Sequence, residues 1–209
     1  MYSQNNEEQI IIDWFAKTEE LRVTPRFFDI GAYHPTKFSN TRRLFELGWR
    51  GVLIEPDPVC MANLRKEYEG VDGITLLENA VITDAERSRG MSTIKFYHAK
   101  GDAVSTTDIA HKQKWETAVS YEAEAIDVQT LTVKELMRSH GVPTFINLDV
   151  EAMNWRIFED IASCMFYLSS LKMVCVEHDG MAKEMVNLAG KFKFQALALN
   201  GENLILARP

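Results

Sequence analysis

Short apolar runs alternate with helical stretches through most of the chain. The runs that predict parallel strands cover residues 26–31, 50–55, 74–82, 144–150 and 171–178. This alternation is typical of strands joined by crossover helices in a parallel sheet. Near the C-terminus, the stretch "FQALALNGENLILARP" contains two apolar runs joined by Asn200-Gly201, which predicts an antiparallel hairpin. The pattern therefore indicates an α/β fold whose mostly parallel sheet ends in an antiparallel pair.

Capping residues mark the ends of several predicted helices. Ser39 suits the N-cap of a helix that ends at Gly48, and Asp57, followed by proline, suits the N-cap of the next one. Thr132 and Glu135 have the spacing of a capping box. These signals support crossover helices between the predicted strands.

The regular alternation breaks between residues 84 and 128. "STIKFYHA" and "YEAEAIDV" predict two additional strands around the polar stretch "KGDAVSTTDIAHKQKWETA", which we expect to be an irregular loop. Long insertions in compact domains are often functional, so residues 84–128 are expected to face a substrate or form a lid. We expect a helical segment at residues 1–20 and a single domain over residues 1–209.

Composition narrows the class of protein. The 209 residues are 46% hydrophobic and 25% charged, which is typical of a soluble globular domain. A net charge of −7 with scattered basic residues argues against binding to nucleic acid. The apolar runs are shorter than the roughly 20 residues of a membrane span, and the acidic start does not resemble a signal peptide. We therefore expect a cytoplasmic protein without a membrane partner; the three cysteines, which form no CxxC pair, are expected to be buried thiols.

Candidate ligand-binding residues follow the predicted strands, because ligands of open parallel sheets bind at the carboxyl ends of strands. Glu55 lies 24 residues after Gly31, the spacing at which an acid meets both hydroxyls of an adenosine ribose. At Gly31 the backbone can approach a ligand closely because no side chain intervenes. The polar strand ends are residues 29–35, 55–57, 79–80, 149–151 and 177–179.

The first of these loops lacks the additional glycines of a dinucleotide fingerprint. A pyrophosphate needs exposed backbone N–H groups, but Tyr33, His34 and Pro35 occupy the loop, and proline has no N–H to offer. The loop therefore favours an adenosine ligand without a pyrophosphate. S-adenosylmethionine is the commonest cofactor of that kind.

Several motifs resemble the FkbM-type family of S-adenosylmethionine-dependent methyltransferases. They are "YSQNNEE", "DIGAYHP", "SNTRRLFELGWRGVLIEPDP", "ENAVI", "FINLDVEA" and "VCVEHD", which together span nearly the whole chain. The resemblance implies a Rossmann-like class I methyltransferase fold, with three α/β/α layers and seven strands of which the last is antiparallel. The predicted hairpin at Asn200-Gly201 agrees with that implication.

The resemblance also implies roles for individual residues. Asp149 and Glu151 would border the methionine end of the cofactor and the transfer site, and Ser3 and Gln4 would fold over the cofactor or substrate. The family usually has "DVEGxE" where this chain has "DVEAMN", so the cofactor end is kept and the substrate end is altered. The implied cofactor-binding residues are Asp29, Gly31, Ala32, Tyr33, Glu55, Pro56, Asp57, Asn79, Ala80 and Asp149.

A base is needed to take a proton from the methyl acceptor. His178 is the first candidate because its ordinary pKa lies near neutrality and it ends a central strand. Glu151 and Asp149 are the alternatives. His34 is expected to be structural or to contact the cofactor, whereas His98, His111 and His140 are expected at the surface.

A divalent metal ion could bind between Asp149 and one of Glu177, His178 and Asp179, as hard oxygen and imidazole ligands converge there. Acids at strand ends are common without a metal, so no metal site is predicted.

The sequence thus predicts a methyltransferase that uses S-adenosylmethionine to methylate a hydroxyl of a sugar or another polar small molecule. The first alternative is a nicotinamide-dependent oxidoreductase, disfavoured by the glycine-poor loop and the terminal hairpin. The second is a cofactor-binding protein that has lost catalysis and serves as a scaffold. The altered "EAMN" segment keeps that second alternative open.

Overall fold

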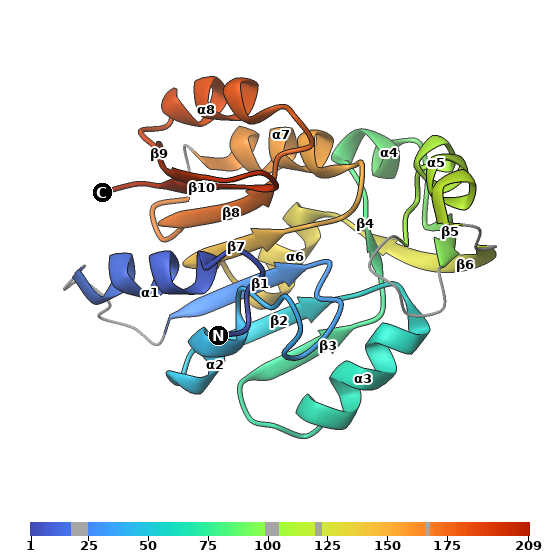
Figure 1. Ribbon diagram of the computed structural model, residues 1–209, viewed down its shortest axis with the longest axis horizontal. Coiled ribbons are helices and arrows are strands. Elements are labelled where there is room, and N and C mark those ends of the chain that lie inside the picture. Colours follow the sequence, from blue (N-terminus) through green and yellow to red (C-terminus); the bar gives the residue numbers. More distant parts are fainter. Residues whose placement is uncertain (18–24, 99–104, 120–122, 166–167) are drawn as a thin grey trace.

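The computed structural model describes residues 1–17, 25–98, 105–119, 123–165 and 168–209. Within them, one seven-stranded sheet has the order β3-β2-β1-β7-β8-β10-β9 (Figure 1). Neighbours from β3 to β8 pair in parallel, whereas β10 runs antiparallel to both β8 and β9. This arrangement confirms the predicted fold class. The strands are β1 (Arg26–Ile30), β2 (Arg50–Ile54), β3 (Ile74–Leu77), β7 (Phe145–Leu148), β8 (Met173–Glu177), β9 (Gln195–Leu199) and β10 (Asn203–Ala207).

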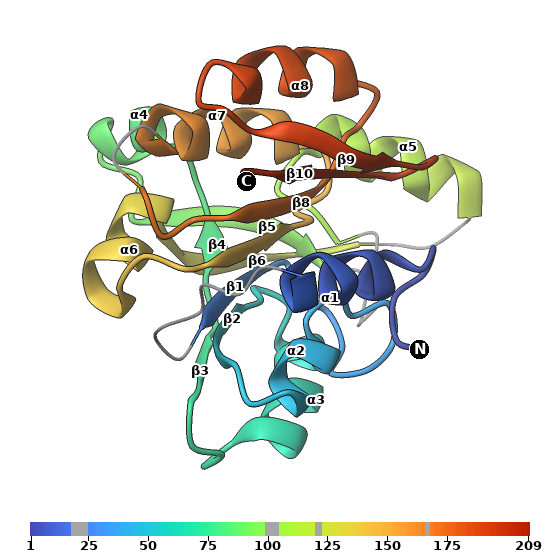
Figure 2. The ribbon, with the colours of Figure 1, turned by 90° about the vertical axis from the view of Figure 1, so that its left-hand side faces the viewer.

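Helices cover both faces of this sheet (Figure 2). The helices α1 (Glu7–Lys17), α2 (Arg42–Glu46) and α3 (Pro58–Tyr68) pack on one face and bury a core that includes Ile11, Leu44 and Leu64. On the other face lie α6 (Val133–His140), α7 (Asn154–Met165) and α8 (Ala182–Gly190), which bury Leu136 and Phe158. The result is the expected three-layer α/β/α arrangement. No helix in the described parts of the chain is long and apolar enough to cross a membrane.

Two of the predicted N-caps are present. The Asp57 side chain accepts hydrogen bonds from the backbone N–H groups of Val59 and Cys60 at the start of α3, which has proline at its first position. Thr132 and Glu135 form a reciprocal capping box at the start of α6. These caps fix where the chain turns into each helix after leaving a strand.

The predicted cap at Ser39 is wrong in position. Helix α2 begins at Arg42, and Thr41 is its N-cap residue, although its side chain makes no capping bond. The Thr41 hydroxyl instead donates a hydrogen bond to Asp29. Ser39 Oγ lies farther back and accepts hydrogen bonds from the N–H groups of Thr41 at 3.4 Å and Arg42 at 3.0 Å. The Thr41 hydroxyl, which would otherwise cap the helix, is therefore bonded to Asp29 in β1.

The predicted strand at residues 74–82 is divided in the structure. β3 ends at Leu77, and β4 (Ala80–Val81) belongs to a second sheet with the order β4-β6-β5. In that sheet β5 (Thr93–His98) pairs antiparallel with β6 (Glu124–Leu131), which correspond to the two additional strands predicted for this region. The run looked continuous because Ala80 and Val81 are buried in their new surroundings, so hydrophobicity does not mark the change of sheet.

The polar stretch inside the insertion is not wholly irregular, contrary to expectation. It contains α5 (Ile109–Val119), and the shorter α4 (Asp84–Ser88) precedes β5. The apolar residues of α5 do not recur on one face, so periodicity gave no helical signal. Asp108 was a signal for the start of this helix, because an aspartate often serves as an N-cap. Its carboxylate accepts a hydrogen bond from the N–H of His111.

Candidate cofactor and active site

A cavity of about 430 Å³ opens at the carboxyl ends of the central strands. It lies where the strand order changes direction between β1 and β7, the position expected for a ligand in this kind of sheet. Its volume is in the range of small-molecule and cofactor sites. All ten residues predicted to bind the cofactor line it, as do Gln4 and Glu151. The sequence-based prediction therefore selected residues that the fold brings together.

Glu55 lines the cavity directly after the end of β2. The residue is only 6% exposed, and each carboxylate oxygen accepts one backbone hydrogen bond of 2.8 Å, from Tyr33 N–H and from Asp57 N–H. Burial raises the pKa of Glu55 to about 7. Since a carboxylate oxygen can accept two hydrogen bonds, each retains one acceptor position for a hydroxyl group in the cavity.

The loop after β1 uses its backbone donors within the protein. Gly31 N–H and Ala32 N–H both donate to the carbonyl oxygen of Ile54, at 2.9 and 3.1 Å, and Tyr33 N–H donates to Glu55. Pro35 has no N–H. These four positions therefore offer no backbone donor to a pyrophosphate, in agreement with the expectation from the sequence.

Gly31 is required for a different reason from the expected one. Its φ is +83°, and an added Cβ would lie 1.6 Å from the carbonyl oxygen of Asp149. The backbone that approaches Gly31 closely is therefore the end of β7. A glycine here lets two strand ends meet beside the cavity.

Buried side chains link the loop, the start of α2 and β7. Asp29 accepts hydrogen bonds from the Thr41 hydroxyl and from Asn147 Nδ2. Asn147 Oδ1 in turn accepts a hydrogen bond of 3.0 Å from Asn40 Nδ2. Burial raises the pKa of Asp29 to about 6. Asp29 lines the cavity as predicted, but both of its oxygens are bonded to the protein, so it mainly holds the loop in place.

The wall next to β4 is apolar. Ala80 and Phe96 line the cavity and pack with Val128 in a small core of the second sheet. Asn79 lies beside them at the point where the chain leaves the large sheet. An apolar surface with one amide nearby suits a flat aromatic ring such as adenine.

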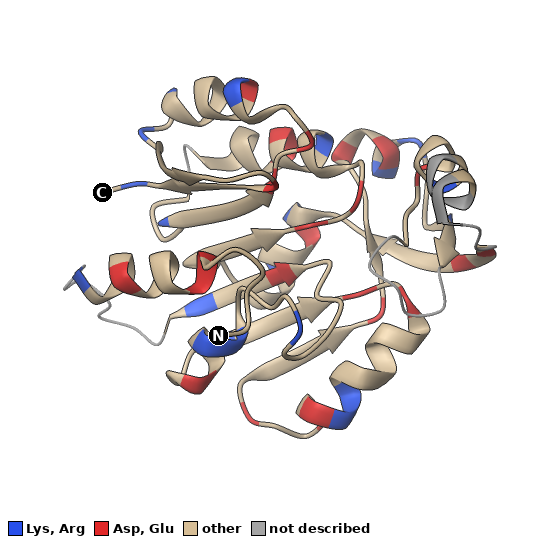
Figure 3. Ribbon diagram, viewed as in Figure 1, with Lys and Arg blue, Asp and Glu red and all other residues tan. Residues whose placement is uncertain are grey.

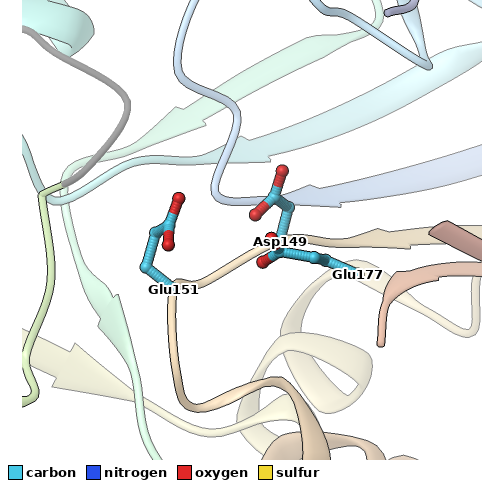
Figure 4. Close-up of side chains that lie close together, drawn as sticks. All are labelled: Asp149, Glu151 and Glu177. Atoms are coloured by element: carbon cyan, nitrogen blue, oxygen red, sulfur yellow. The ribbon is translucent and has the colours of Figure 1, made fainter. Parts of the chain in front are cut away.

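Three carboxyl groups converge at the ends of β7 and β8 (Figure 4). One oxygen from each of Asp149, Glu151 and Glu177 lies within 4.8 Å of the others. Asp149 is accessible from the cavity but surrounded by protein, and burial, followed by the negative charges of Glu177 and Glu151, raises its pKa well above the ordinary value.

Asn154 supports this group of acids from the start of α7. Its Nδ2 donates to Glu177 at 2.8 Å and to Asp179 at 3.0 Å, while its Oδ1 accepts from Val150 N–H. The carboxylates have the hard oxygen atoms that a divalent cation prefers. Asn154 already satisfies one oxygen of Glu177 and one of Asp179 without a cation.

His111 is a cavity residue that the sequence-based analysis placed at the surface, and that expectation is wrong. It lines the cavity from α5, and its Nε2 lies 3.2 Å from Glu151 Oε2. Thr106 also contacts this turn, by donating to the Glu151 carbonyl oxygen. Glu151 and Ala152 have φ values of +43° and +67°, so a strained turn presents the Glu151 side chain.

His178 does not line the cavity. Its Nε2 lies 3.2 Å from the carbonyl oxygen of Asn200, and its Nδ1 accepts a hydrogen bond from Gly180 N–H. The carbonyl can only accept, so Nε2 carries the proton and both ring nitrogens are bonded within the hairpin region. This geometry describes a neutral histidine that holds the turn at Asn200 against the end of β8.

The N-terminal segment contributes one of its two predicted residues. Gln4 lines the cavity and donates a hydrogen bond of 2.9 Å to Glu202. Ser3 points elsewhere, since its hydroxyl accepts from Glu8 N–H at the start of α1. His98, also expected at the surface, is buried beside Asp57.

The cavity is strongly acidic. Figure 3 shows acidic positions at the ends of the central strands. No lysine or arginine is present among the described residues that line the cavity. A ligand with positive charge is therefore favoured over a phosphorylated one. The acidic lining residues are Glu7, Asp29, Glu55, Asp57, Asp149, Glu151, Glu177, Asp179 and Glu202.

The fold defines an α/β protein of the doubly wound class, with a cavity at its topological switch point. The chain belongs to the FkbM methyltransferase family, because the model of the methyltransferase FkbM domain matches residues 29–193. The matched range contains every lining residue discussed above except Gln4, Glu7 and Glu202. Among curated proteins, no sequence matches this chain.

Solved structures with a similar fold are distant in sequence. A putative tRNA (m1A22) methyltransferase, Sp1610 of Streptococcus pneumoniae, is 10% identical, with a TM-score of 0.49 over 98% of this chain and 70% of that one. A protein of the NADB-Rossmann superfamily from Streptococcus agalactiae is 10% identical, with a TM-score of 0.46 over 100% and 69%. Monomeric WbdD is 12% identical, with a TM-score of 0.48 over 98% and 41%.

Proposed function

We propose that this FkbM-family protein binds S-adenosylmethionine and transfers its methyl group to a hydroxyl of a sugar or another polar small molecule in the cytoplasm. The observation that carries the proposal is the Glu55 carboxylate, buried at the end of β2 with each oxygen held by one backbone N–H and able to accept one more hydrogen bond. That arrangement matches the two hydroxyl groups of a ribose.

The remaining walls of the cavity fit the rest of this cofactor. Ala80, Phe96 and Asn79 would contact the adenine, and the loop at Gly31 would lie along the ribose and sulfur. The amino-acid end would reach Asp149. When bound, S-adenosylmethionine supplies a methyl group already activated by a positively charged sulfur, and the acidic lining complements that charge.

Glu151 is the residue best placed to take the proton from the acceptor. Asp149 is a poorer candidate, because burial and the negative charges of Glu177 and Glu151 raise its pKa well above the ordinary value, which disfavours the ionised form that a base needs. Glu151 lies at the same strand end with His111 3.2 Å away to orient its carboxylate. With the cofactor bound, Glu151 would take the hydroxyl proton of the acceptor as its oxygen is methylated.

The insertion would form the acceptor side of the site. Ser105, Thr107 and His111 line the cavity from this segment and offer hydroxyl and imidazole groups. Such groups suit a neutral polyhydroxy compound, while the excess of carboxylates disfavours phosphate esters and nucleic acid. We propose that residues 84–128 face the acceptor as a wall or lid.

Calorimetric titration tests the cofactor. S-adenosylhomocysteine, the demethylated product, should bind with micromolar affinity and NADH should not. The family assignment favours methyl transfer over the nicotinamide-dependent alternative, and the reverse ligand preference would overturn this proposal. A screen of hydroxylated acceptors for methyl transfer then separates an enzyme from a scaffold protein that only binds the cofactor. This distinction matters because Asn154 stands where the family motif "DVEGxE" has its second acid.

A further inference from the structure

A second cavity, of about 400 Å³, lies at the opposite end of the central strands from the acidic cavity described above. It opens at the amino ends of β1, β2 and β3, which run side by side in the same direction (Figure 1). The two cavities share no lining residue among those the structure describes. Arg26 lines the second cavity and Ile30 the first, and a strand rises about 3.3 Å per residue, so roughly 13 Å of β1 separates them.

Two arginines lie side by side in the second cavity. Arg26 and Arg50 are the first residues of β1 and β2 and are paired in register, so their side chains lie on the same face of the sheet. That face is the one covered by α6, because Phe28, two positions after Arg26, is buried in the core beneath this helix. Like charges on neighbouring strands repel each other. The sheet therefore brings together two positive charges that an anion would stabilise.

The protein does little to neutralise these two charges. Arg26 is partly buried, and its guanidinium has no hydrogen bond or ion pair with any residue that the structure describes. Its Nη1 lies 2.5 Å from where a Cβ on Gly141 would be, so a glycine after α6 leaves room for this group. Arg50 has one ion pair, with Asp72 at 4.0 Å, but the Asp72 side chain is 99% exposed and so contributes little. No aspartate or glutamate is present in the described lining of this cavity.

The remaining polar groups of the second cavity are donors. Thr75 on β3 and Ser139 on α6 contribute hydroxyl groups, and His140 contributes an imidazole. All three side chains can donate hydrogen bonds. Guanidinium groups bind phosphate through pairs of parallel hydrogen bonds, and two of them match the two negative charges of a phosphate monoester better than the single charge of a carboxylate. The volume of the cavity also leaves room for a small organic group.

We infer that the second cavity is a binding site for the phosphate group of a small molecule, held by Arg26 and Arg50. The inference goes beyond the proposed methyl transfer and does not depend on it, because the site lies at the other end of the strands. The acidic cavity disfavours phosphate, so the two cavities select ligands of opposite charge. Inorganic phosphate and phosphate esters share the required chemistry, and the experiment separates them.

Calorimetric titration in a phosphate-free buffer at constant ionic strength tests this site. Inorganic phosphate should bind the native protein with a dissociation constant of about 1 mM or lower, and acetate at least about tenfold more weakly. Arg50→Gln should weaken phosphate binding by about tenfold to a hundredfold, as expected for losing hydrogen bonds to a charged group. Arg138→Gln is the matched control, because Arg138 is exposed in the last turn of α6 but does not line the cavity. It should bind phosphate as the native protein does.

Arg26→Gln should lose phosphate binding to the same extent. If Arg26 only neutralises the carbonyl end of α6, this variant instead has a lower melting temperature and unchanged phosphate affinity, and that outcome overturns the site. If Arg26→Gln does not fold, Arg50→Gln decides alone, since the Arg50 side chain is 55% exposed and its replacement disturbs no packed core.

Glycerol 3-phosphate identifies the source of the phosphate. Tighter binding than inorganic phosphate assigns the site to an organic phosphate ester, and weaker binding assigns it to the free ion. The absence of phosphate binding, equal binding of acetate, or an equal loss in Arg138→Gln overturns the inference. Competition between phosphate and S-adenosylhomocysteine would place the phosphate in the acidic cavity and also overturn it. If S-adenosylhomocysteine does not bind at all, the proposed function fails, whereas the phosphate titrations still decide on the second cavity.

Discussion

Replacing Glu55 by glutamine tests the ribose assignment most directly. Each carboxylate oxygen accepts a backbone N–H at 2.8 Å, so the amide nitrogen of a glutamine must face either Tyr33 N–H or Asp57 N–H, donor against donor. An unpaired buried donor costs about 1–3 kcal/mol, and we expect the free energy of unfolding to fall by that amount. One acceptor for the ribose is also lost. Affinity for S-adenosylhomocysteine should therefore fall by about 5- to 150-fold.

The pH dependence of binding provides an independent readout. Burial raises the pKa of Glu55 to about 7 in the unliganded protein. Ribose hydroxyls donate to the ionised carboxylate, so binding lowers this pKa and affinity rises with pH through about 7. Affinity should be up to about tenfold weaker at pH 6 than at pH 8. Glu55→Gln should remove most of this dependence.

The same pKa predicts the sign of the effect on folding. Because the folded value lies above the ordinary value of 4.5, the folded protein holds this proton over a pH range in which the unfolded chain has lost it. The contribution of Glu55 to the free energy of unfolding therefore decreases as pH rises from about 4.5 to about 7. Denaturant titrations across this range, with and without Glu55→Gln, measure the difference.

Glu78→Gln is a suitable control for these measurements, because Glu78 is exposed, pairs with Arg65 and does not line the cavity. Calorimetry at pH 6, 7 and 8 on the native protein and both variants gives the affinities. Equal affinities for native protein and Glu55→Gln, or the same pH dependence in both, would refute the reasoning about Glu55.

Four further outcomes follow from the site. Glu151→Gln should lower turnover by about 10²- to 10⁴-fold with little change in S-adenosylhomocysteine affinity, and a normal rate would exclude Glu151 as the base. His178→Ala should lower the melting temperature while turnover is retained, because both ring nitrogens bond to backbone outside the cavity; loss of turnover would restore the prediction from the sequence. Gly31→Ala should lower the free energy of unfolding by more than about 3 kcal/mol in denaturant titration, since its Cβ would lie 1.6 Å from Asp149 O. Exhaustive chelation of divalent metal ions should leave the methyltransferase activity unchanged. If chelation abolishes the activity and magnesium alone restores it, the site binds a metal ion.

The central strands could be predicted because each is an apolar run with a polar residue at its carboxyl end. β7 is buried throughout, and the Asn200-Gly201 turn identified the hairpin that gives the sheet its antiparallel edge. The change of sheet after Leu77 could not be predicted. Residues Ala80 and Val81 remain buried after the change, and only their pairing partners differ.

That the proposed cofactor residues would line one cavity was predictable for a related reason. Acids and small residues at the ends of neighbouring parallel strands must meet at one edge of the sheet, whatever the details of the loops. His111 and Asn40 are different, because their partners Glu151 and Asn147 are distant in the sequence; Asn40 and Asn147 are 107 positions apart. No local pattern connects a residue in a helix of an insertion, or a residue two positions before a helix start, with a strand end.

The loop after β1 shows how backbone hydrogen bonds can select a cofactor. In this loop the N–H groups of Gly31 and Ala32 are bonded to Ile54, and that of Tyr33 to Glu55. Glu55 thus has two effects, since the carboxylate proposed to hold the ribose also takes a donor that a pyrophosphate would need. The close approach at Gly31 is likewise satisfied by β7 rather than by a ligand. The proposed preference for a cofactor without a pyrophosphate thus has a physical cause in this loop, because the protein uses these donors itself. The absence of further glycines in the sequence indicates this only indirectly.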